Sequence, residues 1–328
     1  MHILIVDRSG PIPAPKYGGT ERVIWGLGKC LNLLGHKVTY LVPGGFKGDF
    51  AECLYLDQSK DLNIQIPNYI DVVHINYNPL QSINKPYLIT MHGNPGAMDS
   101  IDKNTVFISK NQAERYNSEV YIHNGLYWED YNTPNLNKKR DYFHFLGKAS
   151  WRVKNVFGAA KIVRKANGVL KIGGGSRWCK RNFFRGFKYI LDPKIQFLGM
   201  VNDEDKIKMM EKSKALVTPV LWHEPFGLAI IESLYAGCAV FGTSNGSLPE
   251  LISPRVGLIS NEYDTLAKAL NTFEYDPQYC HEYAKRNFNA EKMTLAYLKL
   301  YEKVISGKKL HQQNPEFSKE KNKINQLT

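Results

Sequence analysis

Short apolar runs alternate along this chain with stretches in which apolar residues recur every three or four positions. The first run is Ile3–Val6, and a second, Lys37–Val42, follows a helical pattern that begins at Thr20 and ends at Gly35. A continuous apolar run is typical of a strand buried on both faces of a parallel sheet, and apolar residues at helical spacing predict an amphipathic helix. This opening segment therefore predicts a right-handed βαβ unit.

The same alternation continues through two successive parts of the chain. In the first part, strands are predicted at Val72–Ile75, Tyr87–Met91, Val106–Ile108 and Val120–Ile122. In the second part, strands are predicted at Phe143–Leu146, Val169–Ile172, Ile195–Leu198, Ala215–Pro219 and Ala239–Gly242, and helices at Val156–Lys165, Asp203–Lys212 and Gly227–Ala236. Because regular alternation of strands and helices builds a parallel sheet with helices on both faces, we expect an α/β protein with two doubly wound Rossmann-like domains.

A polar segment, Tyr131–Asp141, separates the two parts and is interpreted as the interdomain linker. We expect an N-terminal domain over residues 1–137 and a C-terminal domain over residues 138–289. A helix at about 290–305 is expected to pack back on the first domain. Residues 306–328 are rich in Lys, Asn and Gln with almost no apolar side chains, and they predict a flexible basic tail.

Length and cysteine content narrow the class of protein. At roughly 100–200 residues per domain, a chain of 328 residues has room for two domains. The cysteines are odd in number, scattered and without a C-x-x-C pair: Cys30, Cys53, Cys179, Cys238 and Cys280. This pattern argues against a disulfide framework or a zinc site and favours a reducing cytoplasm. No apolar run approaches the length of a membrane span.

The formal net charge of +12 favours polyanionic partners: nucleic acid, anionic lipid or phosphate-bearing substrates. Charge alone does not choose among them. The stretch 177–188 interleaves cations with aromatic residues, which could stack a base, touch a membrane surface or form a solvated flap. Because the charges are spread along the chain and no nucleic-acid-binding motif is found, nucleic acid is not the expected partner.

Candidate chemistry gathers where predicted strands end. After the strand that ends at Pro219, a tight loop carries Glu224, and a helix opens at Phe226-Gly227-Leu228. The first N–H groups of a helix lack intrahelical partners and bind anions. Glu232 lies two turns along this helix, so two carboxylates could accept hydrogen bonds from sugar hydroxyls. A solvated Glu on a helix that starts with Pro explains the same pattern.

Three cations, Lys148, Arg152 and Lys154, follow the predicted strand Phe143–Leu146. Ligands of open α/β sheets bind outside the carboxyl ends of the strands. These cations would suit a diphosphate and would stabilise a leaving nucleotide as a metal otherwise does, although a solvated basic loop is the alternative. No H-E-x-x-H and no D-x-D pair near a strand end occurs, so we expect no metal and no cofactor.

Three further segments at predicted strand ends or helix starts are candidates for close approach to a ligand. Gly18-Gly19 precede the first helix, where paired glycines let backbone approach a ligand or simply form a loop and N-cap. His92 could contact a sugar or help a proton leave an acceptor hydroxyl, or it could be structural. Gly173–Gly175 lack the Lys-Ser/Thr of a P-loop and predict a close-approach turn.

Taken together and in order, these segments resemble the GT-B retaining glycosyltransferases of family 4, or glycosyl transferases group 1, from Met1 to about Tyr301. The motifs that carry the resemblance are Tyr17–Arg22, His123-Asn124-Gly125, Gly199-Met200-Val201, Glu224-Pro225-Phe226-Gly227-Leu228 through Glu232, and Gly246-Ser247-Leu248-Pro249-Glu250. The resemblance implies an acceptor-side first domain that faces a donor-binding second domain across a cleft. The family's usual Gly-Arg is Gly147-Lys148 here, and its Lys-Gly is Lys154-Asn155.

The resemblance also implies roles for particular residues. Glu224 would hold the transferred sugar and Glu232 the ribose, while the Gly199-Met200-Val201 turn would contact the base. Backbone at Phe226, Gly227 and Leu228 would bind phosphate or sugar. Lys154 would bind the diphosphate, with Lys148 or Arg152 in place of the family's arginine. His92 would lie near the transferred sugar, with the Gly18-Gly19 loop closing over the donor.

The implied activity is transfer of a sugar from a UDP- or GDP-linked donor to a hydroxyl acceptor, with retained configuration. A carbohydrate or lipid-linked acceptor would place the enzyme in surface glycan or glycolipid synthesis, cytoplasmic or held weakly against the anionic inner face of a membrane. The alternatives are a non-catalytic nucleotide-sugar-binding protein, for which the Lys148 and Asn155 departures argue, and a nucleic-acid-binding protein, for which the charge argues.

Overall fold

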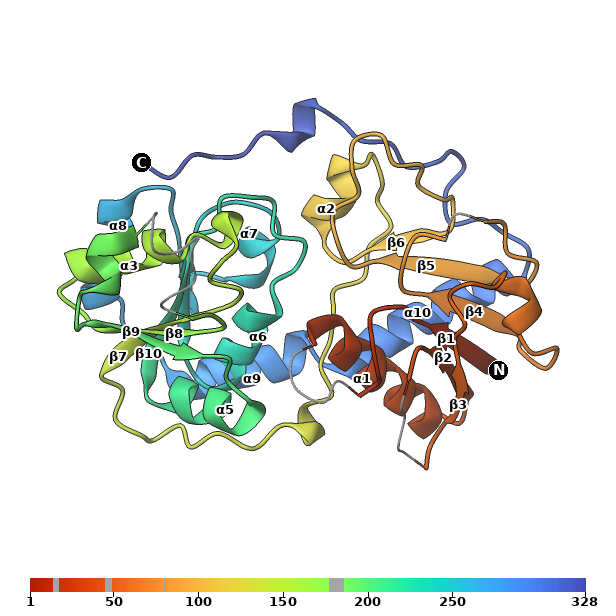
Figure 1. Cartoon of the computed structure of the whole chain (residues 1–328), viewed down its shortest axis with the longest axis horizontal. Helices are drawn as coiled ribbons and strands as arrows, with labels where there is room; N and C mark the ends of the chain where they lie inside the picture. The colour runs from red at the N-terminus through yellow and green to blue at the C-terminus, as the bar shows by residue number, and fades with distance from the viewer. Residues whose placement is uncertain (14–17, 45–48, 80, 177–185) are drawn as a thin grey trace. The chain divides into compact units, whose positions relative to one another are not determined.

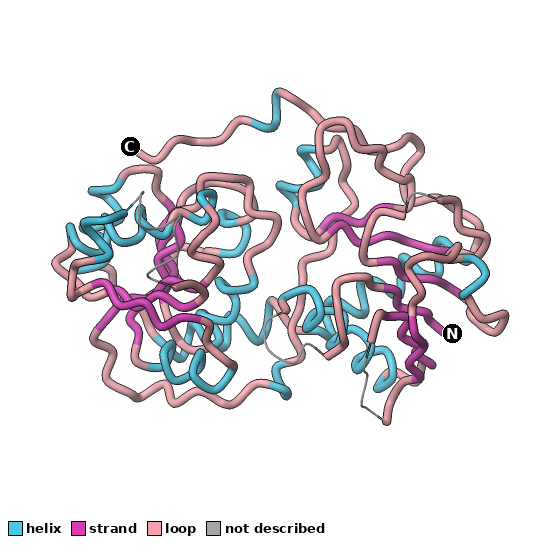
Figure 2. The backbone as a smooth tube through the Cα atoms, viewed as in Figure 1, coloured by secondary structure: helices cyan, strands magenta, loops and turns pink. Residues whose placement is uncertain are grey.

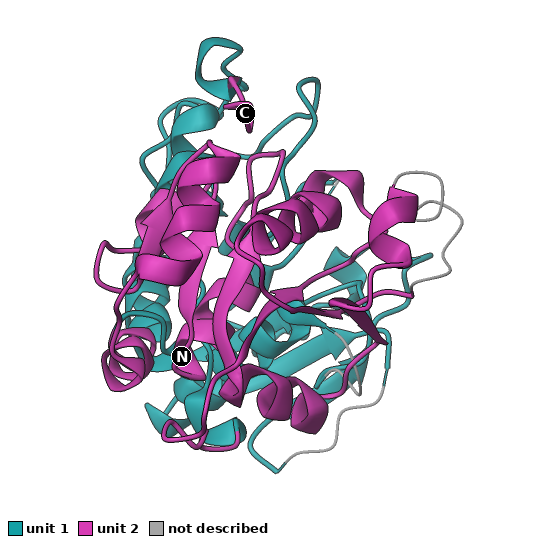
Figure 3. Cartoon of the chain, turned by 90° about the vertical axis from the view of Figure 1, so that its left-hand side faces the viewer, with its two compact units in different colours: residues 1–131, 287–322 teal, residues 132–286, 323–328 magenta. Residues whose placement is uncertain are grey.

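The computed structural model describes residues 1–13, 18–44, 49–79, 81–176 and 186–328. The chain forms two compact α/β units (Figure 1). Unit 1 comprises residues 1–131 and 287–322, and unit 2 comprises residues 132–286 and 323–328, drawn in teal and magenta in Figure 3. Most of the basic and aromatic stretch 177–188 lies outside the described residues.

Unit 1 is built on a six-stranded parallel sheet in the order β3-β2-β1-β4-β5-β6. Its strands are β1 (His2–Val6), β2 (Lys37–Val42), β3 (Glu52–Tyr55), β4 (Val72–Ile75), β5 (Tyr87–Met91) and β6 (Thr105–Phe107). Its helices are α1 (Gly19–Leu33), α2 (Lys110–Arg115) and α10 (Ala290–Ile305), with short 3-10 turns η1 (Asn63–Gln65), η2 (Trp128–Asp130) and η4 (Glu320–Asn322). The strand order reverses between β1 and β4, which makes this edge the switch point of a doubly wound sheet.

Unit 2 repeats the arrangement with the order β12-β11-β10-β7-β8-β9. Its strands are β7 (Tyr142–Leu146), β8 (Leu170–Gly173), β9 (Ile195–Gly199), β10 (Ser213–Thr218), β11 (Ala239–Gly242) and β12 (Gly257–Ile259). Its helices are α3 (Val156–Lys165), α5 (Asp203–Glu211), α6 (Leu228–Tyr235), α7 (Leu248–Leu251), α8 (Tyr263–Thr272) and α9 (Pro277–Asn287), with the 3-10 turn η3 (Arg152–Lys154). Figure 2 shows helices and loops on both sides of the strands. The switch point lies between β7 and β10.

These two sheets confirm the predicted α/β fold with two doubly wound halves. The prediction of a strand at Val120–Ile122 was wrong, because that segment contributes a single bridge from Tyr121 to Phe107. The strands β3 and β12 were not predicted. Both are short edge strands that are partly exposed, so neither has a continuous buried apolar run.

Buried histidines fasten helices to each sheet. In unit 1, His74 on β4 is hydrogen-bonded through Nδ1 to the Tyr301 hydroxyl at 2.7 Å and through Nε2 to the Thr90 hydroxyl at 2.7 Å. Tyr301 belongs to α10, so the C-terminal helix packs on the sheet of unit 1. In unit 2, His144 on β7 is bonded to Ser213 at 2.7 Å and to Ser233 of α6 at 2.9 Å.

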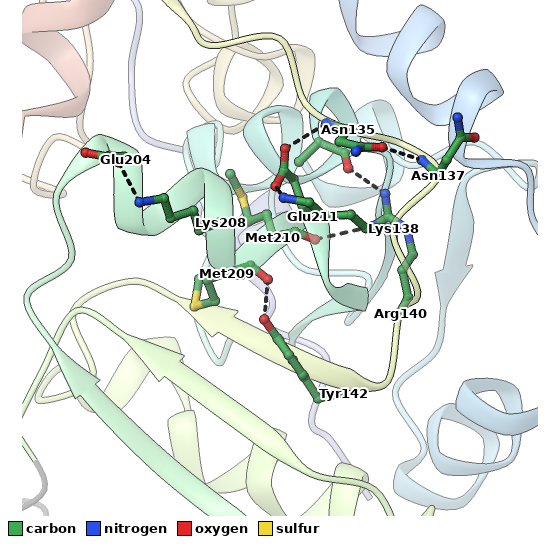
Figure 4. Close-up of polar contacts among 11 residues, drawn as sticks. Asn135, Asn137, Lys138, Arg140, Tyr142, Glu204, Lys208, Met209, Met210 and Glu211 are labelled. Carbon is green, nitrogen blue, oxygen red and sulfur yellow. Dashed lines mark hydrogen bonds and ion pairs between the residues drawn. The ribbon is translucent and has the colours of Figure 1, made fainter.

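The segment that joins the units lies along α5 of unit 2 (Figure 4). The backbone N–H of Asn135 donates to Glu211 Oε1 at 2.7 Å, and Lys138 forms an ion pair with the same carboxylate. Arg140 donates to the carbonyl of Met210 at 3.3 Å. Because this segment is fastened to α5, the structure divides the units at residue 131, six residues before the boundary expected from composition.

The tail, which its composition predicts to be flexible, makes defined contacts along its path. In unit 1, Leu310 is buried and the N–H of His311 donates to the carbonyl of Lys103 at 3.0 Å. In unit 2, the N–H of Thr328 donates to the carbonyl of Asn261 at 2.8 Å. Backbone and amide hydrogen bonds hold much of this segment in place. The pattern of apolar residues does not predict such bonds.

Candidate functional site

Two loops diverge from the switch point of unit 2. One follows β7 and carries Lys154, and the other follows β10 and carries Glu224. The N–H of Leu221 donates to the carbonyl of Val153 at 2.8 Å, which joins the loops through their backbones. The strand order thus places two predicted site residues, far apart in sequence, at the edge where such sheets bind ligands.

A lysine and a carboxylate are paired at this edge. Lys154 Nζ lies 2.8 Å from Glu224 Oε1 and 2.6 Å from Oε2. The indole N–H of Trp222 donates to Glu224 Oε2 at 2.9 Å. The Glu224 side chain is 8% exposed and that of Lys154 is 22% exposed. The carboxylate is therefore oriented from two sides, while the ammonium group keeps access to a ligand.

Asn155 stands where the family usually has glycine, and its backbone conformation explains why asparagine is accepted there. It has a left-handed backbone, with φ 54° and ψ 50°, which glycine and asparagine adopt most readily. Its side-chain oxygen accepts from the N–H of Gly158 at 3.1 Å, and its amide nitrogen donates to the carbonyl of Pro219 at 2.9 Å. Asn155 therefore caps the following helix, and the same side chain also holds the two loops together.

The Gly246–Glu250 segment supports the Glu224 loop from behind. A Cβ at Gly246 would overlap the backbone nitrogen of Glu224, so only glycine fits there. The N–H of Ser247 donates to the carbonyl of Glu224 at 3.0 Å, and its hydroxyl donates to the carbonyl of Phe226 at 2.5 Å. Gly227, with φ 95°, begins α6, and Leu228 is its first helical residue. The two motifs therefore form one rigid loop at the helix start.

Glu232 faces α5 rather than solvent. Lys206 Nζ lies 2.6 Å from Glu232 Oε1 and 3.2 Å from Asp203 Oδ1. Lys206 is 8% exposed and Glu232 is 7% exposed. Sequence reasoning missed Lys206. The available signal was its place on the inward face of α5, at helical spacing from the buried Met209 and Met210.

Glycines meet where β7, β8 and β9 end. The N–H of Gly147 donates to the carbonyl of Gly173 at 3.1 Å, and that of Gly174 donates to the carbonyl of Gly199 at 2.8 Å. Gly174 has φ 103°, and a Cβ there would overlap the carbonyl oxygen of Gly147. These glycines therefore form a turn in which backbone segments approach one another closely, and its approach to a ligand stays a prediction. Beyond Gly199, the Met200 side chain is 65% exposed, and Val201 lies against Gly173.

The other two predicted cations of this loop are exposed. Lys148 Nζ lies 4.9 Å from the centre of the Trp151 ring, and Trp151 meets Trp222 edge to face at 6.3 Å. Arg152 opens η3 and is exposed. Of the three, Lys154 is the one hydrogen-bonded to Glu224.

In unit 1, His92 follows β5 and is oriented by Asn76, which follows β4. The Asn76 amide nitrogen donates to the carbonyl of Val6 at 3.2 Å, so its oxygen faces His92 Nε2 at 2.9 Å. His92 then donates from Nε2, which leaves Nδ1 as an acceptor. Burial lowers the pKa of His92 to about 4. A neutral imidazole of this kind is better suited to accept a hydrogen bond than to remove a proton.

The predicted glycine loop also belongs to unit 1. Gly18 is the N-cap residue of α1, with the extended backbone angles φ 177° and ψ 98°, and Gly19 is its first helical residue. The preceding residues 14–17 lie outside the described residues. The structure therefore places Gly18 and Gly19 at a helix start, as the sequence predicts.

Comparison with known protein families identifies the chain. The model of the family described as "Glycosyl transferases group 1" matches residues 127–290, which is half of the chain. The chain belongs to this family. The match includes the site residues Lys154, Glu224 and Glu232, together with all six strands of unit 2.

Individual relatives agree with this membership. An uncharacterized glycosyltransferase of Methanocaldococcus jannaschii is 33% identical over 98 residues, which are 29% of this chain and 24% of that protein. The chain spans about a quarter of the length of the curated relatives it matches.

Solved structures share the fold over almost the whole chain. AviGT4, a glycosyltransferase involved in avilamycin A biosynthesis, gives a TM-score of 0.79 at 18% identity, with 93% of this chain and 98% of that chain covered. HepE of Anabaena in complex with UDP-glucose gives a TM-score of 0.64 at 15% identity, with 93% of this chain and 100% of that chain covered. At this level of identity the likeness shows the shared GT-B fold. The helices in the described part of the chain include none that could span a membrane.

Proposed function

We propose that the protein transfers a sugar from a nucleoside-diphosphate sugar to a hydroxyl acceptor, with retained configuration. The Lys154–Glu224 pair beside the start of α6 carries this proposal, because it joins a cation for phosphate with a carboxylate for sugar hydroxyls. The bound UDP-glucose of HepE favours a uridine donor, and a guanosine donor is the alternative.

The proposed donor site uses the switch-point edge of unit 2. Lys154 and the N–H groups of Gly227 and Leu228 would bind the diphosphate, since a helix start and a cation both favour negative charge. Glu224 would accept hydrogen bonds from hydroxyls of the transferred sugar. Lys148 and Arg152 would add charge at the rim in place of the family's arginine. Glu232 would accept from the ribose, and the Gly199–Val201 turn would contact the base.

The reaction would break the bond between the sugar's anomeric carbon and the leaving phosphate oxygen. The acceptor oxygen would form its bond to the same carbon on the same face, and its proton would pass to the leaving phosphate. Lys154 would stabilise the negative charge that develops on the leaving group. This scheme needs no protein nucleophile and no metal or cofactor. In unit 1, His92 and the Gly18-Gly19 loop are proposed as further residues that bind substrate.

The acceptor is proposed to be a carbohydrate or lipid-linked hydroxyl, which would fit surface glycan or glycolipid synthesis in the cytoplasm. The net charge of +12 would add weak attraction to an anionic membrane face. We expect salt-dependent sedimentation with anionic vesicles, and no sedimentation at low salt would rule this attraction out.

Donor turnover tests the proposed activity. The purified protein is incubated with UDP- and GDP-sugars, and release of the nucleoside diphosphate is followed with and without EDTA. We expect slow hydrolysis that EDTA does not reduce and that Glu224→Gln lowers by about 100-fold or more. Glu204→Gln, an exposed carboxylate on α5, serves as the matched control and should retain activity.

The outcomes separate the alternatives. Wild-type rates for Glu224→Gln with the true donor and acceptor would overturn the assignment of Glu224. Donor binding without release of nucleoside diphosphate, across a panel of acceptors, would favour a non-catalytic binding protein. Loss of turnover in EDTA, restored by a divalent cation, would replace the metal-free scheme.

A further inference from the structure

Lys206 links the two helices that flank the proposed nucleotide site. It lies on α5, which begins directly after the Gly199–Val201 turn and is capped by Asn202, whose side chain accepts from the N–H of Asp205 at 2.8 Å. Its ammonium group reaches Glu232 on α6 at 2.6 Å. The Lys206 side chain therefore joins α5, which follows the turn proposed to contact the base, to α6, which carries the glutamate proposed to contact the ribose.

Packing alone does not explain a lysine at this position. Its neighbours on the inward face of α5, Ile207 and Met210, are buried apolar residues. A buried ion pair is often no more stabilising than apolar residues of similar size, because both charges lose their hydration. Lys206 is 8% exposed and directly contacts Glu232, a carboxylate of the proposed site. This contact points instead to a role in orienting that carboxylate.

We propose that Lys206 is a positioning residue for the nucleotide ribose, because its ammonium group holds the Glu232 carboxylate in an orientation that accepts ribose hydroxyls. This inference rests on the proposed donor site. The pair is made through Oε1, and a carboxylate has about four lone-pair sites, so hydroxyls can still be accepted. A hydrogen bond to an ionised carboxylate is roughly twice as strong as one between neutral groups.

The proposal predicts selectivity for ribose over deoxyribose. A site whose buried polar group is prepared for a hydroxyl rejects an analogue that lacks it, because the group is then left without its partner. Asp203 also lies 3.2 Å from Lys206, so the ammonium is held from both α5 and α6. Without this cation, Glu232 loses the contact that orients it toward the ribose hydroxyls.

Calorimetric titration with UDP, 2′-deoxy-UDP and 3′-deoxy-UDP, and with the guanosine series, tests the inference. Wild type should bind the ribonucleotide at least about tenfold tighter than one deoxy analogue, the effect of one charge-assisted hydrogen bond. Lys206→Met should weaken ribonucleotide binding by about tenfold and leave the deoxy analogue nearly unchanged, so that selectivity collapses. Lys206→Arg should restore part of it. The matched control is Lys208→Met, because Lys208 is exposed on the same helix and paired with Glu204 (Figure 4).

The outcomes distinguish this inference from the proposed function. If wild type binds no nucleoside diphosphate, the donor site itself is wrong. If Lys206→Met is folded and keeps the full ribose preference, the donor site stands and the role of Lys206 is overturned. Should Lys206→Met fail to fold because it leaves a buried carboxylate unpaired, the double variant Lys206→Met/Glu232→Gln removes that charge. Full ribose preference in the double variant would equally overturn the inference.

Discussion

Lys154 Nζ lies within 2.8 Å of both carboxylate oxygens of Glu224, so one ammonium group spans the carboxylate. A lysine has three N–H donors, and two of them account for these bonds. The third can be directed to a phosphate oxygen. The indole of Trp222 holds Glu224 Oε2 independently, at 2.9 Å. The same lysine can therefore bind a diphosphate and keep the neighbouring carboxylate in place for sugar hydroxyls.

Lys154→Met should lower kcat by about 100-fold or more, because loss of one preorganised charge that stabilises the leaving group typically costs 10²–10³. Lys148→Met should cost less, about tenfold or below, since Lys148 is exposed over Trp151. Steady-state kcat and KM with the donor measure both. Lys165→Met, which removes an exposed lysine of α3 paired with Asp264, is the control. A larger loss for Lys148 than for Lys154 would transfer the diphosphate role to Lys148.

Asn155 should contribute to stability through its backbone conformation as well as its cap. Asn155→Ala loses the bond to Gly158 and places alanine at φ 54°, so we expect a loss of about 2–3 kcal/mol in the free energy of unfolding. Asn155→Gly keeps the left-handed backbone and should lose about 1 kcal/mol or less. In urea unfolding, the free energy of unfolding should decrease from wild type to Asn155→Gly to Asn155→Ala. Equal losses in the two variants would show that backbone conformation plays no part.

The sequence predicts the central strands of both sheets because those strands are buried on both faces. Ile3–Val6 is a continuous apolar run for this reason. The edge strands β3 and β12 lack such a pattern because they are short and partly exposed. The tail escapes it as well, since bonds such as that of the His311 N–H depend on backbone groups that every residue carries.

The site is predictable where motif and strand end coincide, as at Lys154 and Glu224. Lys206 is not found this way, because helical spacing indicates only that it faces inward, and its partner Glu232 is 26 residues away in the sequence. Asn76 is likewise found only once the strand order places β4 beside β5 and His92. Pairings between elements depend on strand order, which local patterns do not contain.

Buried histidines should make the protein sensitive to mild acid. Burial lowers the pKa of His74 and of His144 to about 3, and that of His92 to about 4. Below about pH 6.5 the unfolded chain takes up these protons while the folded chain does not, so stability falls with decreasing pH. Each histidine contributes a slope of about 1.4 kcal/mol per pH unit between its unfolded and folded pKa values.

His144→Asn should lower the free energy of unfolding at pH 7, because the hydrogen bonds to Ser213 and Ser233 are lost or altered. It should also reduce the dependence of that free energy on pH by about 1.4 kcal/mol per pH unit, the contribution of one histidine. Urea midpoints between pH 7 and pH 5 measure both effects. An unchanged slope in the variant would mean that His144 is protonated equally in the folded and unfolded chain.

The tail should be protected rather than mobile along unit 1. Phe317 packs against Tyr116, with ring centres 5.8 Å apart, and the flanking N–H groups of Glu316 and Ser318 donate to the carbonyls of Tyr116 and Arg115 at 3.0 and 2.9 Å. An apolar contact between two backbone hydrogen bonds makes a small cooperative unit, whose opening depends on the area that the ring buries.

Phe317→Ala should therefore speed hydrogen exchange at the Glu316 and Ser318 amides by about tenfold, which corresponds to about 1.4 kcal/mol of local opening free energy. Exchange in β1, at the centre of the sheet, should not change, because the global free energy of unfolding depends little on this segment. Gln313→Ala, an exposed position in the same tail, is the control. If the wild-type amides of Glu316 and Ser318 already exchange as fast as those of an unfolded peptide, the tail is flexible, as its composition alone predicts, and the Phe317 contact does not hold it.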